Sequence, residues 1–133
     1  MTASRLALVD TDVLIDYGRD VPAAVDVLAS LLPDKLAAVS VVTYLELLAG
    51  CRDKREQAAL DAFMAAFVLI HIDESVSNRA LELMRRYRLS HGLRLPDALI
   101  AACALAQGLT LVSKNQKDYR FIDELDLPPY PAT

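Results

Sequence analysis

Apolar residues occur along this chain in short blocks of two kinds. Four blocks are continuous runs typical of buried parallel strands, at residues 5–9, 36–39, 68–72 and 109–112. Between them, apolar residues recur three and four positions apart, as on the buried face of a helix. Strands alternating with helices predict a parallel sheet covered on both faces. We therefore expect an α/β fold, a three-layer α/β/α domain with a central parallel sheet of four to five strands, the proline-containing tail being irregular or a short edge strand.

Residues that begin and end helices mark the expected helical segments. These segments are residues 11–17, 22–32, 41–49, a helix with its apolar face at residues 60–67, a helix with its apolar face at residues 76–87, and residues 96–107. Ser40 and Ser75 are expected N-caps, because a hydroxyl accepts hydrogen bonds from the free N–H groups of a first turn. The glycines at positions 50, 92 and 108 are expected to end helices.

Length and composition suit one domain spanning residues 1–133, and 54% hydrophobic residues can fill a sizeable core. No apolar run reaches the roughly 18 residues of a membrane span, and the first ten residues lack the features of a signal peptide. We therefore expect a cytoplasmic protein. Cys51 and Cys103 form no metal-binding or disulfide pattern and are expected to be structural thiols. The net charge of −4 argues weakly against nucleic-acid binding, although carboxylates gathered around cations would cancel part of it.

A single carboxylate stands at the start of the most apolar helix. Residues 93–106 are almost wholly apolar, which predicts a helix buried on most sides, yet Asp97 lies in its first turn. Such a carboxylate has two interpretations. It accepts hydrogen bonds from the free N–H groups of the helix start, or it is a metal ligand.

Three further acidic residues are placed where the fold can bring them to Asp97. Asp10 ends the first strand, Glu46 lies about two helical turns after the second, and Asp118 follows the fourth by a short loop. Parallel sheets bind ligands beyond the carboxyl ends of their strands. Carboxylates gathered there repel one another unless they share protons or bind cations, and oxygen ligands select Mg²⁺ or Mn²⁺ over zinc. Such a site either hydrolyses phosphodiester bonds or merely binds metal.

The segments around these acids resemble those of one known family. They resemble the four motifs of PIN-domain ribonucleases, particularly those of the VapC-type toxins of bacterial toxin–antitoxin pairs. The matching segments are LVDTDVLID around Asp10, SVVTYLELLAG around Glu46, LRLPDALIAACAL around Asp97 and LTLVSKNQKDYRFI around Asp118. The resemblance covers nearly the whole chain, and the motifs occur in order.

This resemblance implies an endoribonuclease that uses Mg²⁺ or Mn²⁺ to cleave an RNA substrate. It further implies a homodimeric toxin and a cognate antitoxin that inserts a segment into the active-site groove, giving a heterotetramer or a larger assembly. The apolar faces at residues 60–67 and 76–87 are candidate dimer surfaces.

Residue by residue, the resemblance assigns metal binding and catalysis to Asp10, Glu46, Asp97 and Asp118. The fourth acid of the family aligns with either Asn115 or Asp118. We favour Asp118, with Ser113 and Asn115 as hydrogen-bonding neighbours. The family often has Thr and Arg before this Asn, and Ser113 and Lys114 keep a hydroxyl and a positive charge there.

Other polar residues near these motifs have less specific assignments. Thr11 either orients a ligand or water, or caps the helix that begins there. Asp12 and Asp16 are expected to be solvated positions or caps rather than ligands. Charge runs are usually solvated faces, but basic residues that flank the motifs are candidates for contacts with RNA phosphates. The candidates are Arg52, Lys114 and Lys117.

Three other functions compete with a metal-dependent nuclease. A phosphoacceptor receiver domain would be phosphorylated on Asp73, with Lys114 as its strand-end lysine, but it leaves two of the four acids unexplained. A phosphatase of the haloacid-dehalogenase type would use the DxD pattern at residues 10–12, but the glycine that usually follows is absent. The third alternative is a non-catalytic interaction module of the same fold, with or without bound metal.

Overall fold

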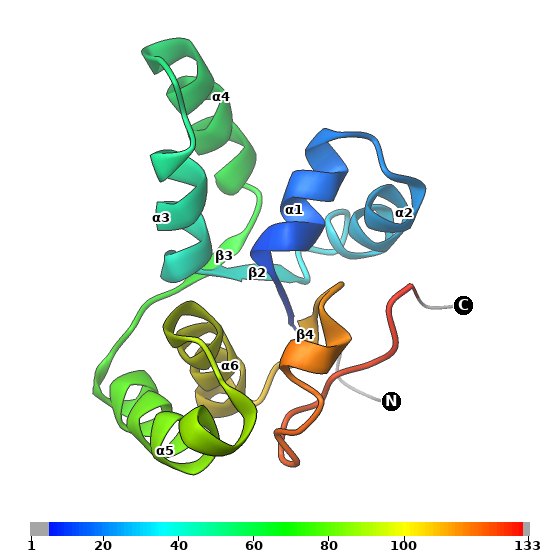
Figure 1. The fold of residues 1–133 in the computed structure, drawn as a ribbon. Coiled ribbons are helices and arrows are strands. Elements are labelled where there is room, and N and C mark those ends of the chain that lie inside the picture. Colours follow the sequence, from blue (N-terminus) through cyan, green and yellow to red (C-terminus); the bar gives the residue numbers. More distant parts are fainter. Residues whose placement is uncertain (1–5, 132–133) are drawn as a thin grey trace.

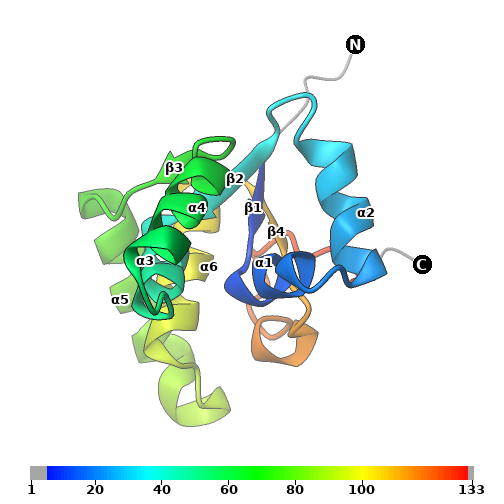
Figure 2. The ribbon, with the colours of Figure 1, turned by 90° about the horizontal axis from the view of Figure 1, so that it is seen from above.

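Four short strands form the centre of the fold in a computed structural model that describes residues 6–131. They are β1 (Ala7–Val9), β2 (Ala37–Ser40), β3 (Val68–Ile70) and β4 (Thr110–Val112), and all pair in parallel in the order β3-β2-β1-β4. The inner strand β1 lies between β2 and β4 (Figure 2), with Ala7 opposite Ala37 on one side and Thr110 on the other. The predicted parallel sheet is confirmed, and within the described residues the tail adds no fifth strand. Arg5, expected in the first strand, lies outside the described residues.

Helices connect the strands and cover both faces of the sheet (Figure 1). They are α1 (Thr11–Gly18), α2 (Pro22–Leu31), α3 (Val41–Ala49), α4 (Lys54–Met64), α5 (Glu74–His91) and α6 (Leu95–Gln107), and a 3-10 turn, η1 (Gln116–Asp118), follows β4. All six helices were expected. Their ends differ from the expected ones by at most two residues, except that α4 stops before Phe67.

The start of α5 differs from the prediction. Ser40 is the N-cap of α3, as expected, since its hydroxyl accepts a hydrogen bond of 3.1 Å from the N–H of Val42. The N-cap of α5, however, is Asp73 and not Ser75, because Asp73 Oδ1 accepts a hydrogen bond of 2.9 Å from the N–H of Val76. The assignment of Ser75 was wrong because two residues suited to capping lie two positions apart, and the helix begins at the first of them.

Glycines end three helices, as predicted, in two different ways. Gly92 after α5 and Gly108 after α6 have φ angles of +70° and +66°, a left-handed conformation that disfavours residues with a Cβ. Gly50 after α3 has a φ of −85°, which any residue can adopt. Only the ends of α5 and α6 therefore require glycine.

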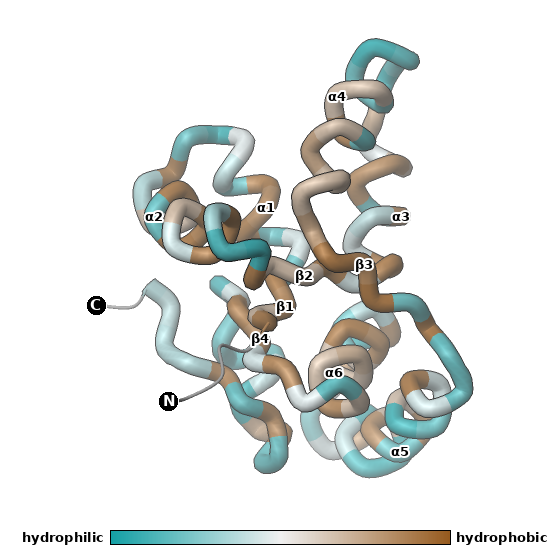
Figure 3. Tube along the Cα trace, turned by 180° about the vertical axis from the view of Figure 1, so that it is seen from behind, coloured by the Kyte–Doolittle hydropathy of each residue, from teal (hydrophilic) through white to brown (hydrophobic). Residues whose placement is uncertain are grey.

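The sheet separates two apolar cores, so both of its faces are buried. Leu8 points into the core formed with α5 and α6, whereas its neighbours Ala7 and Val9 point into the core formed with α1 and α2. Figure 3 shows apolar residues along the strands and polar residues on the outer turns of the helices. The three-layer α/β/α architecture is confirmed.

The two apolar faces considered as dimer surfaces face these cores instead. Their buried side chains are Met64, Phe67, Val76, Ala80, Leu83 and Tyr87. Large apolar side chains of α5 and α6 that do reach solvent are Leu81, 52% exposed, Leu89, 97% exposed, and Leu95, 60% exposed. A face that packs on a sheet has the same helical periodicity as a face that packs on another subunit, so the role of these faces in a dimer stays a prediction that rests on their partly buried residues, Leu60, Phe63 and Met84.

Two further expectations concern the cysteines and the membrane. Cys51 and Cys103 are both free thiols, and Cys103 is buried in the core beside α5. Among residues 6–131, no helix combines the length and the apolar character needed to span a membrane.

Candidate active site

The carboxyl ends of the inner strands bring three of the predicted acids to one pocket. Asp10 directly follows β1, Glu46 lies in α3 after β2, and Asp97 lies in the first turn of α6. These three acids line a pocket of about 180 Å³. The other residues lining it are Thr11, Asp12, Ile15, Ile100 and Asn115. Because β1 lies beside β2, the helices that follow these strands, α1 and α3, lie side by side at this edge of the sheet. The helix that precedes β4, α6, begins at the same edge, beside α3 (Figure 1).

Asp10 is the most rigidly held of the three acids and is only 5% exposed. Its Oδ1 accepts a hydrogen bond of 2.9 Å from the N–H of Thr11, which makes Asp10 the N-cap of α1, and its Oδ2 accepts one of 2.7 Å from the hydroxyl of Ser113. Burial raises the pKa of Asp10 above its ordinary value, against the effect of these hydrogen bonds, and the charge of Glu46 raises it further. A nearby cation would favour the ionised form.

Thr11 holds the exposed side chain of Glu46 at the pocket. Thr11 Oγ1 donates a hydrogen bond of 2.8 Å to Glu46 Oε1 and lies 2.9 Å from Thr43 Oγ1. Since a hydroxyl carries one proton, the fully buried Thr43 donates to Thr11 when Thr11 donates to Glu46. Of the two roles considered for Thr11, the capping role is wrong, because Asp10 is the N-cap. Sequence reasoning missed Thr43, which carries no charge or motif to single it out.

Asp97 accepts a hydrogen bond from a tyrosine and not from its own helix. Its Oδ1 accepts a bond of 3.2 Å from the hydroxyl of Tyr119, and the N-cap residue of α6, Arg94, makes no side-chain capping bond. Burial raises the pKa of Asp97, and the charges of Asp10 and Asp118 raise it further, whereas Tyr119 and Arg94 lower it. The hydrogen bonds of the described residues therefore give the capping interpretation no support.

Asn115 and Asp118, the two options for the fourth ligand, lie in different pockets around Asp97. Asn115 lines the pocket of the three acids, whereas Asp118 lines a smaller pocket of about 70 Å³ to which Asp97 also contributes. The N–H of Asn115 donates a hydrogen bond of 3.1 Å to Ser113 Oγ, so that Ser113 links Asn115 to Asp10. The choice of Asp118 over Asn115 stays a prediction.

Two acids that were expected in solvent or as caps are enclosed. Asp16 is 6% exposed, and its Oδ2 accepts a hydrogen bond of 2.9 Å from the ammonium group of Lys114. Asp12 is half-buried, and its two oxygens are shielded from solvent without a hydrogen-bond partner of ordinary geometry among the described residues. Burial and the charge of Asp10 raise the pKa of Asp12 to about 6. The expectation was wrong because the sheet and the segment after β4 close over one side of the short helix α1.

The predicted basic residues differ in their surroundings. Lys114 is ion-paired with Asp16, and Arg52 is ion-paired with Glu56 at 2.6 Å. Lys117 is exposed and lines the smaller pocket beside Asp97. Contacts of these basic residues with RNA stay predictions.

The donor set suits a hard divalent cation. Asp10, Glu46 and Asp97 offer only oxygen atoms, and their pocket contains no histidine or cysteine. The mutual repulsion that helps to raise the pKa values of Asp10 and Asp97 is one that a cation relieves. In the described part of the chain, no three His, Cys, Asp or Glu side chains meet closely enough to enclose an ion. The side chain of Glu46 is exposed and so has more freedom to move than the buried Asp10.

Comparisons with known proteins agree with this arrangement. The chain is 40% identical over 126 residues to ribonuclease VapC10 of Mycobacterium tuberculosis, covering 94% of this chain and 93% of that protein. It is 38% identical over 128 residues to ribonuclease VapC19 of the same species, covering 94% and 100%. Among solved structures, a toxin–antitoxin complex from Klebsiella pneumoniae matches with a TM-score of 0.79 at 28% identity, covering 94% of this chain and 97% of that chain.

The residues of the receiver alternative are engaged in other contacts. Asp73 caps α5, and Lys114 is paired with Asp16 instead. The PIN domain model, in contrast, matches residues 7–125, a range that runs from β1 past η1 and includes all four predicted acids. This chain therefore belongs to the PIN-domain family.

Proposed function

We propose that this protein is an endoribonuclease that requires Mg²⁺ or Mn²⁺ and acts as the toxin of a toxin–antitoxin pair. The observation that carries the proposal is that Asp10, Glu46 and Asp97, distant in sequence, line one pocket. The names of the similar proteins, ribonucleases VapC10 and VapC19, support RNA as the substrate. The all-oxygen donor set supports a hard cation over zinc.

The protein residues have separate tasks in this chemistry. A bound Mg²⁺ or Mn²⁺ would polarise a phosphoryl oxygen and activate a water for attack on phosphorus. Asp10, Glu46 and Asp97 would hold it, with Asp118 or Asn115 in addition. Asp10 provides a fixed carboxylate, because bonds from Thr11 and Ser113 hold both of its oxygens. Glu46 provides an adjustable one, since among residues 6–131 its carboxylate is held by a single hydrogen bond, from the Thr11 hydroxyl.

A protein partner completes the proposal. The similar solved structure from Klebsiella pneumoniae is a toxin–antitoxin complex, and a nuclease that cleaves cellular RNA must be silenced until it is needed. We expect a cognate antitoxin to cover the acid pocket of a toxin homodimer, in a heterotetramer or a larger assembly.

The substitution Asp97→Asn tests the proposal. We expect it to abolish cleavage of a structured RNA in Mg²⁺ or Mn²⁺ while leaving the fold intact, because the amide keeps the shape of the side chain but loses its charge. Cleavage is followed on gels with antitoxin-free protein, and circular dichroism follows the fold. EDTA should abolish the wild-type activity as well.

Asp123→Asn is the matched control, since Asp123 is exposed and lies outside the acid pocket. It should cleave RNA like the wild type. Cleavage that persists in Asp97→Asn or in EDTA would contradict a metal-dependent nuclease. Binding of Mn²⁺ by the wild type without any cleavage would indicate a non-catalytic metal-binding module.

A further inference from the structure

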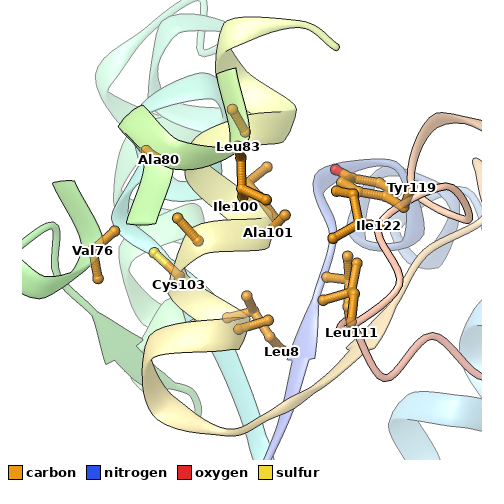
Figure 4. Close-up of a cluster of buried hydrophobic side chains, with 14 of the residues drawn as sticks. Leu8, Val76, Ala80, Leu83, Ile100, Ala101, Cys103, Leu111, Tyr119 and Ile122 are labelled. Atoms are coloured by element: carbon orange, nitrogen blue, oxygen red, sulfur yellow. The ribbon is translucent and has the colours of Figure 1, made fainter. Parts of the chain in front are cut away.

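Tyr119 is a fully buried tyrosine whose hydroxyl lies at the acid pocket. It follows η1, is 0% exposed, and is by volume the largest fully buried residue in the described range 6–131. Figure 4 shows its ring beside Ile122 and Leu111 in the core under α6, with the hydroxyl end turned toward α6. The ring is therefore fixed by packing, and its oxygen has a fixed position.

The hydroxyl lies between two of the proposed ligands. It donates a hydrogen bond of 3.2 Å to Asp97 Oδ1. The hydroxyl is also close enough to Asp10 to lower the pKa of that carboxyl, as it lowers the pKa of Asp97. Tyr119 thus connects a carboxylate at the end of β1 to one at the start of α6.

The hydroxyl acts as a donor and not as an acid or base. Burial raises the pKa of Tyr119 far above its ordinary range, and the charges of Asp10 and Asp97 raise it further. Because a carboxylate can only accept a hydrogen bond, the Tyr119 hydroxyl is the donor in its bond to Asp97. A buried hydroxyl costs stability unless it is hydrogen-bonded, and phenylalanine would fill the same core without that cost.

We infer that Tyr119 is a positioning residue of the acid site, whose hydroxyl holds the Asp97 carboxylate in the orientation that binds the cation together with Asp10. The inference rests on the proposed function, because it treats both acids as metal ligands. The bond to Tyr119 occupies Asp97 Oδ1 and leaves Oδ2 for a ligand. Partners of this kind orient ligand side chains, and their loss typically weakens metal binding by 10- to 100-fold.

The substitution Tyr119→Phe tests this role, with Tyr87→Phe as the matched control. Tyr87 is buried in the same core, and its hydroxyl has no hydrogen-bond partner in the described structure. Removal of the Tyr119 hydroxyl should raise the Kd for Mn²⁺, measured by calorimetry on metal-free protein, by about 10-fold. Removal of the Tyr87 hydroxyl should leave that Kd unchanged. In RNA cleavage at fixed Mn²⁺, Tyr119→Phe should lower kcat and leave KM unchanged.

The outcomes separate this inference from the proposed function. The role of Tyr119 is overturned if the wild-type protein binds Mn²⁺ and cleaves RNA while the Tyr119→Phe variant binds Mn²⁺ with the same affinity. The proposed function then still stands. The positioning role of Tyr119 is also overturned if Tyr119→Phe loses its fold, or if it loses no more Mn²⁺ affinity than Tyr87→Phe. A wild-type protein that neither binds Mn²⁺ nor cleaves RNA defeats both.

Discussion

At the scale of single residues, Asp12 has both carboxylate oxygens shielded from solvent, without a hydrogen-bond partner of ordinary geometry among the described residues. Its pKa is raised from 3.8 to about 6, by burial first and by the charge of Asp10 second. A carboxyl with a higher pKa in the folded state binds more protons when folded. Its contribution to stability is therefore present below pH 3.8 and is lost as the pH rises through about 6. The burial-raised pKa values of Asp10 and Asp97 act in the same direction.

We expect Asp12→Asn to stabilise the metal-free protein at pH 8 and to have little effect at pH 4. The gain at pH 8 should be about 1 kcal/mol, a value reduced from the full pKa difference because a half-buried group is partly screened by solvent. Urea denaturation at both pH values, with EDTA present, measures it. The exposed Asp123→Asn should show no such difference between the two pH values. Equal effects of Asp12→Asn at pH 4 and pH 8 would contradict this assignment.

The sequence predicts a residue of the candidate site only where a charged side chain stands at a recognisable position, such as the end of a strand or the inside of an apolar helix. Asp10, Glu46 and Asp97 stand out because each is an acid next to a strand end or within an apolar helix. Thr43 and Tyr119 do not stand out, because their place in the site depends on the paths of α3 and η1. A tyrosine beside apolar residues also has the pattern of an ordinary core position.

At the scale of elements, the start of α5 shows how a capping residue sets a helix boundary. Asp73 Oδ1 accepts a hydrogen bond from the N–H of Val76, and the helix begins at Glu74. Asp73→Ala should therefore destabilise the protein by about 1 kcal/mol, whereas Ser75→Ala should change its stability by less than about 0.5 kcal/mol. Urea denaturation of the two variants measures the difference. The reverse order of effects would restore Ser75 as the cap.

Element boundaries and element types were predictable to different degrees. The helix in 41–49 has an unambiguous start and end, because Ser40 and Gly50 enclose a continuous helical pattern. The strand expected at residues 68–72 ends at Ile70, since apolar character continues beyond the last ladder pair, Ser40 with Ile70. Local sequence therefore predicts which element forms, and pairing between distant strands determines where it stops.

At the scale of the whole molecule, the expected homodimer can be tested without reference to the acid pocket. Most of the large side chains on the apolar faces first considered for it are buried in the two cores, and Leu60, Phe63 and Met84 are only partly buried there. We nevertheless expect a homodimer of the 14.6 kDa chain, as the family resemblance implies. Sedimentation velocity on antitoxin-free protein over a range of concentrations measures it. A monomer at all concentrations would remove the homodimer from the proposed function but would not affect the acid pocket.

The parallel pairing of β1 with β4 joins the two ends of the chain. The hydrogen bond from Ser113 to Asp10 spans 103 positions, and Ala7 has no β4 partner until Thr110 has been made. A chain that ends before residue 110 lacks the strand that pairs with this side of β1, and it lacks Ser113 and Tyr119. The hydrogen bonds from Ser113 to Asp10 and from Tyr119 to Asp97 therefore form only after residues 110–119 have been made.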